Sequence, residues 1–174
     1  GTSAEPDLSS LLDLVALGTV ADMVSLDQNN RILVAAGLRQ IRNGHACAGI
    51  RALLQVADRD PATLTTAELG FVVAPRINAA GRLEDMGLGI ECLTTDDDAP
   101  ALELAHRLSA INAERREIQS QMVEQAEAAV ARWTGTHGEQ ALPCGVVLFE
   151  QEWHPGVVGL VASRLKEQLH RPVV

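Results

Sequence analysis

Aromatic side chains are scarce in this 174-residue chain, which contains no tyrosine and only 2% aromatic residues. A hydrophobic content of 47% still allows a sizeable core, so we expect that core to be built from Leu, Val, Ile and Ala.

Cysteines and uninterrupted apolar runs are scarce as well. The three cysteines, Cys47, Cys92 and Cys144, lack metal-ligand spacing, and their odd number argues against a disulfide framework. We therefore expect buried, reduced thiols in a cytoplasmic protein. The chain shows no signal-peptide pattern, and acidic residues interrupt every long apolar stretch, so no membrane span is expected.

Lysine occurs once, at Lys166, so arginine supplies the rest of the 14 basic residues. The formal net charge is −9, which disfavours nonspecific electrostatic capture of nucleic acid by this chain. A locally positive groove lined by arginine can still exist on an acidic body.

Apolar periodicity predicts a mainly helical chain with the beginning of an α/β layer at its end. Before the long helix described next, helices are expected over 8–20, 31–42, 49–56 and 86–92, with a short one opening at Thr66. Asp13 lies inside the first of these helices, where we expect it to face solvent or an ion pair.

One apolar stripe over 99–133 predicts a single helix of roughly 50 Å, long enough to join two domains. The acidic run 96–98 would cap that helix, and 134–140 reads as a linker. Beyond it, 144–149 is predicted as a buried strand, 157–169 as a helix and 172–174 as the start of another strand. These pieces cannot close a domain, so we expect an internal fragment, and the open strand edge near Val174 predicts self-association.

The segment Pro75–Arg82 groups two guanidinium side chains and an amide around a small-residue turn. Arg76 and Arg82 offer planar forks of N–H donors, and Asn78 adds a neutral donor and acceptor. Such a cluster suits an anionic, phosphorylated substrate. The alternative is that both arginines pair with the nearby carboxylates and only fasten a loop.

Two further positions admit both a functional and a structural interpretation. Asp22 ends an apolar helix, where it would either hold Mg²⁺ or Mn²⁺ or simply begin a loop. His154 and Gly156 precede a helix whose free N–H groups favour anions, although a histidine in a loop is often structural. Ser163 and Arg164 lie two turns further along that helix.

Four segments in this order resemble the RecJ family of the DHH phosphoesterase superfamily, which are bacterial exonucleases specific for single-stranded DNA. The segments are LDLVALGTVAD (12–22), NNR (29–31), PRINAAGRL (75–83) and WHPGVVGLVASRL (153–165). The resemblance runs through nearly all of the chain, and the combination of motifs is far more specific than any motif alone.

The resemblance implies a site for a centre of two Mn²⁺ or Mg²⁺ ions, with Asp22 as one ligand. It implies that Arg76, Asn78 and Arg82 line the catalytic cleft near the phosphate. On a facing domain, the residues that grip the DNA strand would be His154, Gly156, Ser163 and Arg164. Residues 1–95 would complete the DHH domain, 96–134 would form the connecting helix, and 141–174 would begin the DHH-associated domain.

The implied activity is 5′-to-3′ degradation of single-stranded DNA in repair and recombination, with protein partners left open. The family's Asp-rich motif and its Asp-His-His motif are not present in this chain, so we expect the fragment alone to be inactive. One alternative is another DHH phosphoesterase that acts on oligonucleotides or cyclic dinucleotides. A non-catalytic helical module that binds a protein partner is the alternative of a different class.

Overall fold

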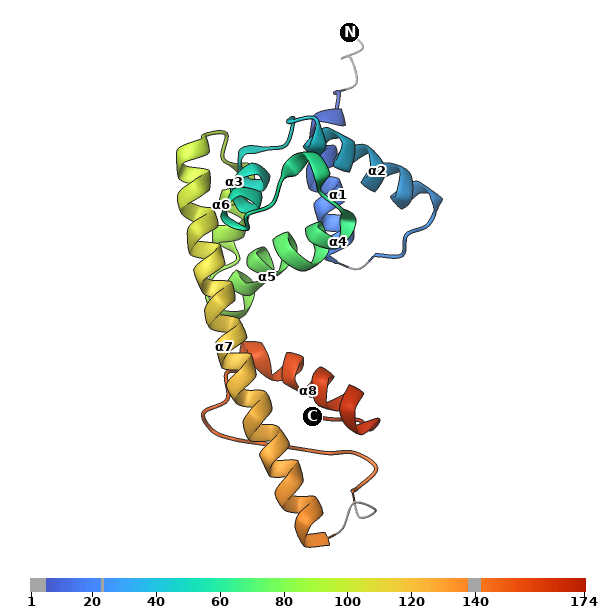
Figure 1. Cartoon of the computed structure of the whole chain (residues 1–174), viewed down its shortest axis with the longest axis vertical. Helices are drawn as coiled ribbons and strands as arrows, with labels where there is room; N and C mark the ends of the chain where they lie inside the picture. The colour runs from blue at the N-terminus through green and yellow to red at the C-terminus, as the bar shows by residue number, and fades with distance from the viewer. Residues whose placement is uncertain (1–5, 23, 138–141) are drawn as a thin grey trace. The chain divides into compact units, whose positions relative to one another are not determined.

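The computed structural model describes residues 6–22, 24–137 and 142–174. Two compact units divide the chain, 1–112 and 113–174, and the boundary falls inside one long helix. The described chain is mainly helical, as predicted. In chain order its elements are η1 (Ser9–Leu11), α1 (Leu12–Ala21), α2 (Gln28–Arg42), α3 (Ala48–Val56), η2 (Pro61–Thr63), α4 (Thr66–Glu68), η3 (Leu69–Val73), α5 (Ala74–Leu83), α6 (Gly87–Thr94), α7 (Asp98–His137) and α8 (Pro155–Leu169) (Figure 1).

In the first unit, α1 packs closely against α2 (Figure 1). Gly37 makes this possible, because a Cβ atom on it would lie only 2.1 Å from the carbonyl oxygen of Leu12. The N-cap residue of α2 is Asp27, whose side chain accepts a hydrogen bond from the N–H of Asn30 at 2.9 Å. The helix therefore begins three residues earlier than predicted.

Asp13 is buried, with 1% of its surface exposed, so the prediction that it faces solvent or an ion pair is wrong. Its two carboxylate oxygens accept hydrogen bonds from the N–H groups of Leu14 and Cys47, at 2.8 and 2.7 Å. Cys47 is the N-cap residue of α3, so Asp13 satisfies a donor at the start of that helix. The physical reason for the burial is this long-range partner, which periodicity cannot reveal.

The segment Pro75–Arg82 lies within α5 and is not a turn, so that part of the sequence prediction is wrong. Alanines and arginines favour a helix, and Pro75 stands in its first turn, where proline is tolerated. A π-helical turn, η3, comes directly before α5. The continuous helical segment of α4, η3 and α5 begins with a capping box formed by Thr65 and Glu68. The arginines and the asparagine are thus distributed around a helix axis.

The long helix α7 is confirmed and extends to His137. Its first part contributes Ala101, Ala105 and Leu108 to the core of the first unit, and Asp98 in its first turn pairs with Arg51 at 2.5 Å. Residues 134–137 are helical, which corrects the predicted linker there, and residues 138–140 lie outside the described residues.

In the second unit, α8 buries Val157, Val161 and Leu165 along one face. In the described part of this unit, the β pairing is limited to one parallel bridge between Val146 and Val173. The predicted buried strand over 144–149 is therefore wrong. Val146 is buried at the bridge, but Val147 and Phe149 after it are exposed. A strand is buried only when neighbours cover both of its faces.

The core consists of Leu, Val, Ile and Ala with single Met and Cys side chains, as the composition predicts. Cys92 is buried, whereas Cys47 is half-buried and Cys144 is exposed. The expectation of three buried thiols therefore holds only for Cys92. Among the described residues, no helix combines the length and the apolar character that a membrane crossing requires.

Candidate active site

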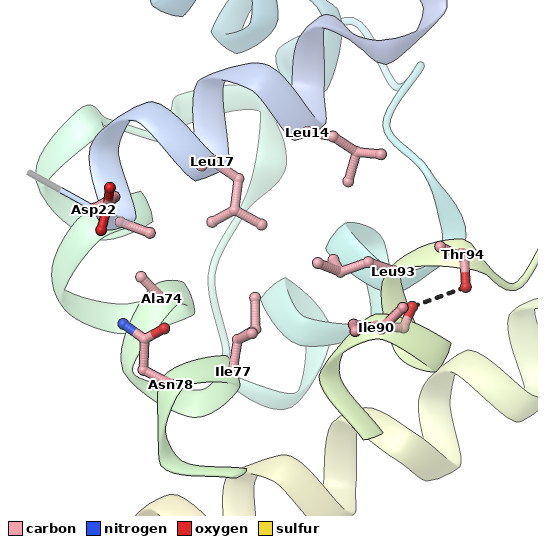
Figure 2. A pocket seen from close by; sticks show the side chains of 11 residues that line it. Leu14, Leu17, Asp22, Ala74, Ile77, Asn78, Ile90, Leu93 and Thr94 are labelled. Atoms are coloured by element: carbon pink, nitrogen blue, oxygen red, sulfur yellow. Dashed lines mark hydrogen bonds between the residues drawn. The ribbon is translucent and has the colours of Figure 1, made fainter. Parts of the chain in front are cut away.

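A pocket of about 430 Å³ opens between α1, α5 and α6 in the first unit. Apolar side chains form most of its wall, and its polar side chains are those of Asp22, Asn78 and Thr94. Figure 2 shows Asp22 and Asn78 toward one end of the pocket and Thr94 toward the other, where Thr94 donates a hydrogen bond to the carbonyl of Ile90. The structure therefore brings two of the predicted site residues together.

Asp22 stands at the C-terminal end of α1 with its carboxylate exposed. Its backbone N–H donates to the carbonyl of Gly18 at 3.1 Å and closes the last helical turn. A negative charge at this end of a helix meets the negative end of the helix dipole, which is unfavourable. A cation or an N–H donor beside Asp22 would offset that repulsion.

The α5 helix separates the three residues of the Arg-Asn motif. Ala74, Ile77 and Asn78 line the pocket from one face of α5 (Figure 2). Arg82 follows Asn78 by four residues and lies on the same face one turn further along. Arg76 precedes Asn78 by two residues, which is about 160° around the helix.

Arg76 lies on the far side of α5 from Asn78 and contacts other elements. Its Nε–H donates to the Oγ of Ser109 on α7 at 3.3 Å, and its Nη1 donates to the carbonyl of Val72 at 2.5 Å. Among the described residues that line the pocket, neither arginine of the motif occurs. Asp22 and Asn78 therefore share this pocket, whereas Arg76 and Arg82 lie outside its lining.

Ser109 was not among the residues that the sequence pointed to. It lies 33 residues from Arg76, within the long helix, and nothing in the local sequence marks this serine as a partner of Arg76. The usable signal is the spacing of the motif, since Asn78 follows Arg76 by two positions and Arg82 follows Asn78 by four. In a helix this spacing places the two arginines on different faces.

Of the four residues predicted in the second unit, two lie at the start of α8 (His154 and Gly156) and two lie just past its middle (Ser163 and Arg164). His154 is the N-cap residue, and its Nδ1 accepts a hydrogen bond from the N–H of Gly156 at 3.1 Å. In the neutral ring the proton is then on Nε2, which becomes the donor. Ser163 follows Gly156 by seven residues, two helical turns, so the two share a face, and Ser163 and Arg164 are exposed.

The turn before α8 is held to the second part of α7. The Nε1–H of Trp153 donates to the Oε1 of Gln125 at 2.7 Å, and Gln168 near the end of α8 donates to Glu127 at 2.9 Å. These bonds position α8, and with it His154, within the second unit.

Comparison with known proteins identifies the family. The single-stranded-DNA-specific exonuclease RecJ of Dickeya dadantii is 52% identical over 171 residues, which cover 98% of this chain and 29% of that protein. The chain belongs to the RecJ family. A crystal structure of exonuclease RecJ bound to manganese matches 98% of this chain and 41% of its own, with a TM-score of 0.82 and 35% identity. RecJ of Thermus thermophilus in complex with Mg²⁺ matches 97% of this chain and 25% of its own, with a TM-score of 0.81 and 36% identity.

No protein-family model matches the chain. Because the chain spans only about three-tenths of the length of the curated RecJ relatives, most of each relative has no counterpart here. Whether the present residues suit the metals of RecJ can be judged from their donors. Asp22 offers exposed carboxylate oxygens, the ligand type that Mn²⁺ and Mg²⁺ prefer, and thus fits as one ligand. The described residues contain no group of three or more His, Cys, Asp or Glu side chains able to hold a metal ion, so they do not form a complete site.

Proposed function

We propose that the complete protein is a metal-dependent exonuclease that degrades single-stranded DNA from the 5′ end and acts in DNA repair and recombination in the cytoplasm. The observation that carries this proposal is the 52% identity, over nearly the whole chain, to an exonuclease named for this specificity. The clustering of Asp22 and Asn78 in one pocket adds support from geometry.

Within the complete protein, Asp22 would serve as one ligand of Mn²⁺ or Mg²⁺, with the other ligands supplied by residues outside this chain. The bound metals would supply an activated water and charge neutralisation for hydrolysis of the phosphodiester bond. The exposed C-terminal end of α1 leaves the Asp22 carboxylate accessible to such ions.

Asn78 and Arg82 would act on the substrate from the pocket-facing side of α5. The Asn78 amide can donate a hydrogen bond to a phosphate oxygen, and the Arg82 guanidinium can offset negative charge on the phosphoryl group. Arg82 lies in the last turn of α5, where a cation is favourably placed relative to the helix dipole.

In the second unit, the Nε2–H of His154, the hydroxyl of Ser163 and the guanidinium of Arg164 would hold the phosphates of the strand. The Nδ1 bond to Gly156 orients the His154 ring for this task. We further propose that 1–95 complete the DHH domain, that 96–134 connect two domains, and that 141–174 begin the second of them.

The test uses the full-length protein, with a 5′-labelled oligonucleotide in single- and double-stranded form and with Mn²⁺ present. Asp22→Asn and Arg82→Ala are each expected to lower kcat by at least about 100-fold. The matched controls are Asp97→Asn and Arg39→Ala, which alter exposed residues away from the pocket. Full activity of the first two variants would refute the assigned roles.

The substrate range of the full-length protein separates the remaining candidates. Digestion of long single strands with little action on duplex supports the exonuclease. A preference for oligonucleotides of a few residues or for cyclic dinucleotides would point to another DHH phosphoesterase. The 174 residues alone, with Mn²⁺ added, should not digest DNA.

A further inference from the structure

Arg76 lies where three elements of the first unit meet. It belongs to α5, its Nη1 donates to the carbonyl of Val72 in η3, and its Nε–H donates to Ser109 of α7. The side chain is partly buried and runs back toward the N-terminus of its own helix, the usual direction for long helical side chains.

Pro75 explains why a π turn precedes α5. A proline has no N–H, and its ring crowds the carbonyl one turn earlier in a regular helix. In η3 the N–H of Ala74 donates instead to the carbonyl of Leu69, five residues back, and this wider turn relieves the crowding. Gly70 allows the widened turn to approach α1, since a Cβ on it would lie 2.9 Å from a methyl group of Val20.

The two bonds occupy two of the five N–H donors of Arg76, including the Nε–H that takes part in two-point recognition of phosphate. Two-point recognition of phosphate uses a pair of neighbouring N–H groups, commonly Nε with one Nη. In Arg76 the Nε–H is directed to Ser109 and Nη1 to Val72, and the residue lies about 160° around α5 from Asn78. This geometry suits a side chain that fastens α5 rather than one that binds substrate.

We propose that Arg76 is a positioning residue, which fixes α5 against α7 through Ser109 and thereby presents Asn78 and Arg82 to the DNA phosphate. The inference rests on the proposed function of Asn78 and Arg82. A second tie supports it at the other end of α5, where Glu84 pairs with Arg107 of α7 at 2.7 Å. Contacts at Arg76 and Glu84 thus join α5 to α7 near both of its ends, and Asn78 and Arg82 lie between these two contacts along the chain.

The salt dependence of DNA binding separates a positioning role from direct binding of phosphate. Removing one phosphate-binding group from a protein that holds a single strand lowers the slope of log K against log salt by about 0.7. We expect Arg82→Ala in the full-length protein to lower this slope by about that amount, and Arg76→Ala to leave it unchanged. Binding to a labelled oligo(dT) is measured by fluorescence anisotropy in EDTA, so that the strand stays intact.

The catalytic constant then shows that Arg76 does more than stabilise the fold. Because a small displacement of a substrate-contacting group slows the reaction, Arg76→Ala should lower kcat about 10- to 100-fold while changing KM little. Ser109→Ala should lower kcat about three- to tenfold, and Ser109→Thr, which keeps the hydroxyl, should restore most of it. Ser120→Ala, at an exposed serine of the same helix, is the control.

A double-mutant cycle on Arg76 and Ser109 provides the last test. Methionine keeps the length of the side chain but cannot donate to Ser109, so Ser109→Ala should have no further effect on kcat in an Arg76→Met background. All rates are measured well below the unfolding midpoint of each variant, which keeps stability out of the comparison. Should Arg76→Ala prove insoluble, Arg76→Met and Ser109→Ala provide the same test.

The outcomes are distinguishable. A lower salt slope for Arg76→Ala, or an unchanged kcat for Ser109→Ala, would overturn the positioning role and leave the proposed function intact. An unchanged slope and rate for Arg82→Ala would instead refute the role proposed for the pocket-facing side of α5.

Discussion

The carboxylate of Asp13 accepts a hydrogen bond from the backbone N–H of Cys47 at 2.7 Å, across 34 residues of sequence. Cys47 is the N-cap residue of α3, so the buried carboxylate lies at the positive end of that helix dipole. This placement compensates for the removal of the carboxylate from water. It also joins α1, which carries Asp22 at its other end, to α3.

Replacing Asp13 by alanine should lower the free energy of unfolding by about 1–3 kcal/mol, because the Cys47 N–H would lose its partner. Asp13→Asn should cost less, since an amide oxygen can still accept the bond. Urea unfolding of the 174-residue chain, followed by circular dichroism, measures both changes. Asp96→Asn, at an exposed position, is the control, and a loss for Asp13→Ala no larger than the control's would contradict the prediction.

Two glycines allow neighbouring helices to approach closely, and alanine at either should destabilise the first unit. A Cβ on Gly37 would lie 2.1 Å from the Leu12 oxygen, and one on Gly49 would lie 2.0 Å from the Cys92 oxygen. Moving backbone to relieve such overlaps costs about 1–3 kcal/mol or more. Gly18→Ala is the control: its Cβ would meet nothing within 4 Å, and it should raise thermal stability slightly. Equal melting temperatures for all three variants would refute the packing argument.

The capping box at the start of α4 should contribute to stability in a pH-dependent way. Hydrogen bonds from the backbone N–H and the hydroxyl of Thr65 lower the pKa of the Glu68 carboxyl below its ordinary value of 4.5. For a lowered pKa, the stabilisation is present above the unfolded-state value and is lost as the pH falls through the folded-state value.

We therefore expect the stability difference between the natural chain and Glu68→Gln to be constant at neutral pH and to shrink below about pH 4.5. Thermal melts at a series of pH values measure it. Glu103→Gln, at an exposed position of α7, should show no such pH dependence. A difference that grew in acid would have the wrong sign for this mechanism.

The three thiols should react with an alkylating reagent in the order of their exposure. Burial raises the pKa of Cys92 to about 11 and also raises the pKa of Cys47, and each raised pKa lowers the fraction of reactive thiolate. At pH 8, iodoacetamide should modify exposed Cys144 first and Cys92 only after unfolding in urea. Mass spectrometry of the digested protein locates the label, and rapid labelling of Cys92 in the folded chain would contradict its burial.

The 174-residue chain should self-associate with increasing concentration through the segment next to the Val146–Val173 bridge. Val147, Phe149 and Val174 are 77%, 83% and 78% exposed, and backbone groups beside a single bridge can pair with another chain. Light scattering should show larger particles at higher concentration, and Val147→Lys should suppress them. Glu152→Lys, at an exposed position after this segment, is the charge control. A concentration-independent mass would refute the prediction.

Local signals predicted most helices but not all of their caps. The apolar periodicity located α3, α6, α7 and α8 to within a few residues, because each helix buries one face and turn residues flank it. The predicted strand at 144–149 failed, because burial of a strand depends on neighbours far away in the chain. The segment Pro75–Arg82 looked like a turn because its proline and glycine are turn formers, yet both are compatible with the first turn and the last turns of a helix.

The linear order of the motifs by itself determined the family of this chain, and the apolar periodicity determined that it is mainly helical, because both depend only on which residue follows which. Only the tertiary structure decided that Asp22 and Asn78 share a pocket, that Arg76 is turned toward Ser109, and that Asp13 is buried against Cys47. The reason is geometric. A helix turns by about 100° per residue and sends neighbouring side chains to different partners, and those partners come from segments that the local sequence does not specify.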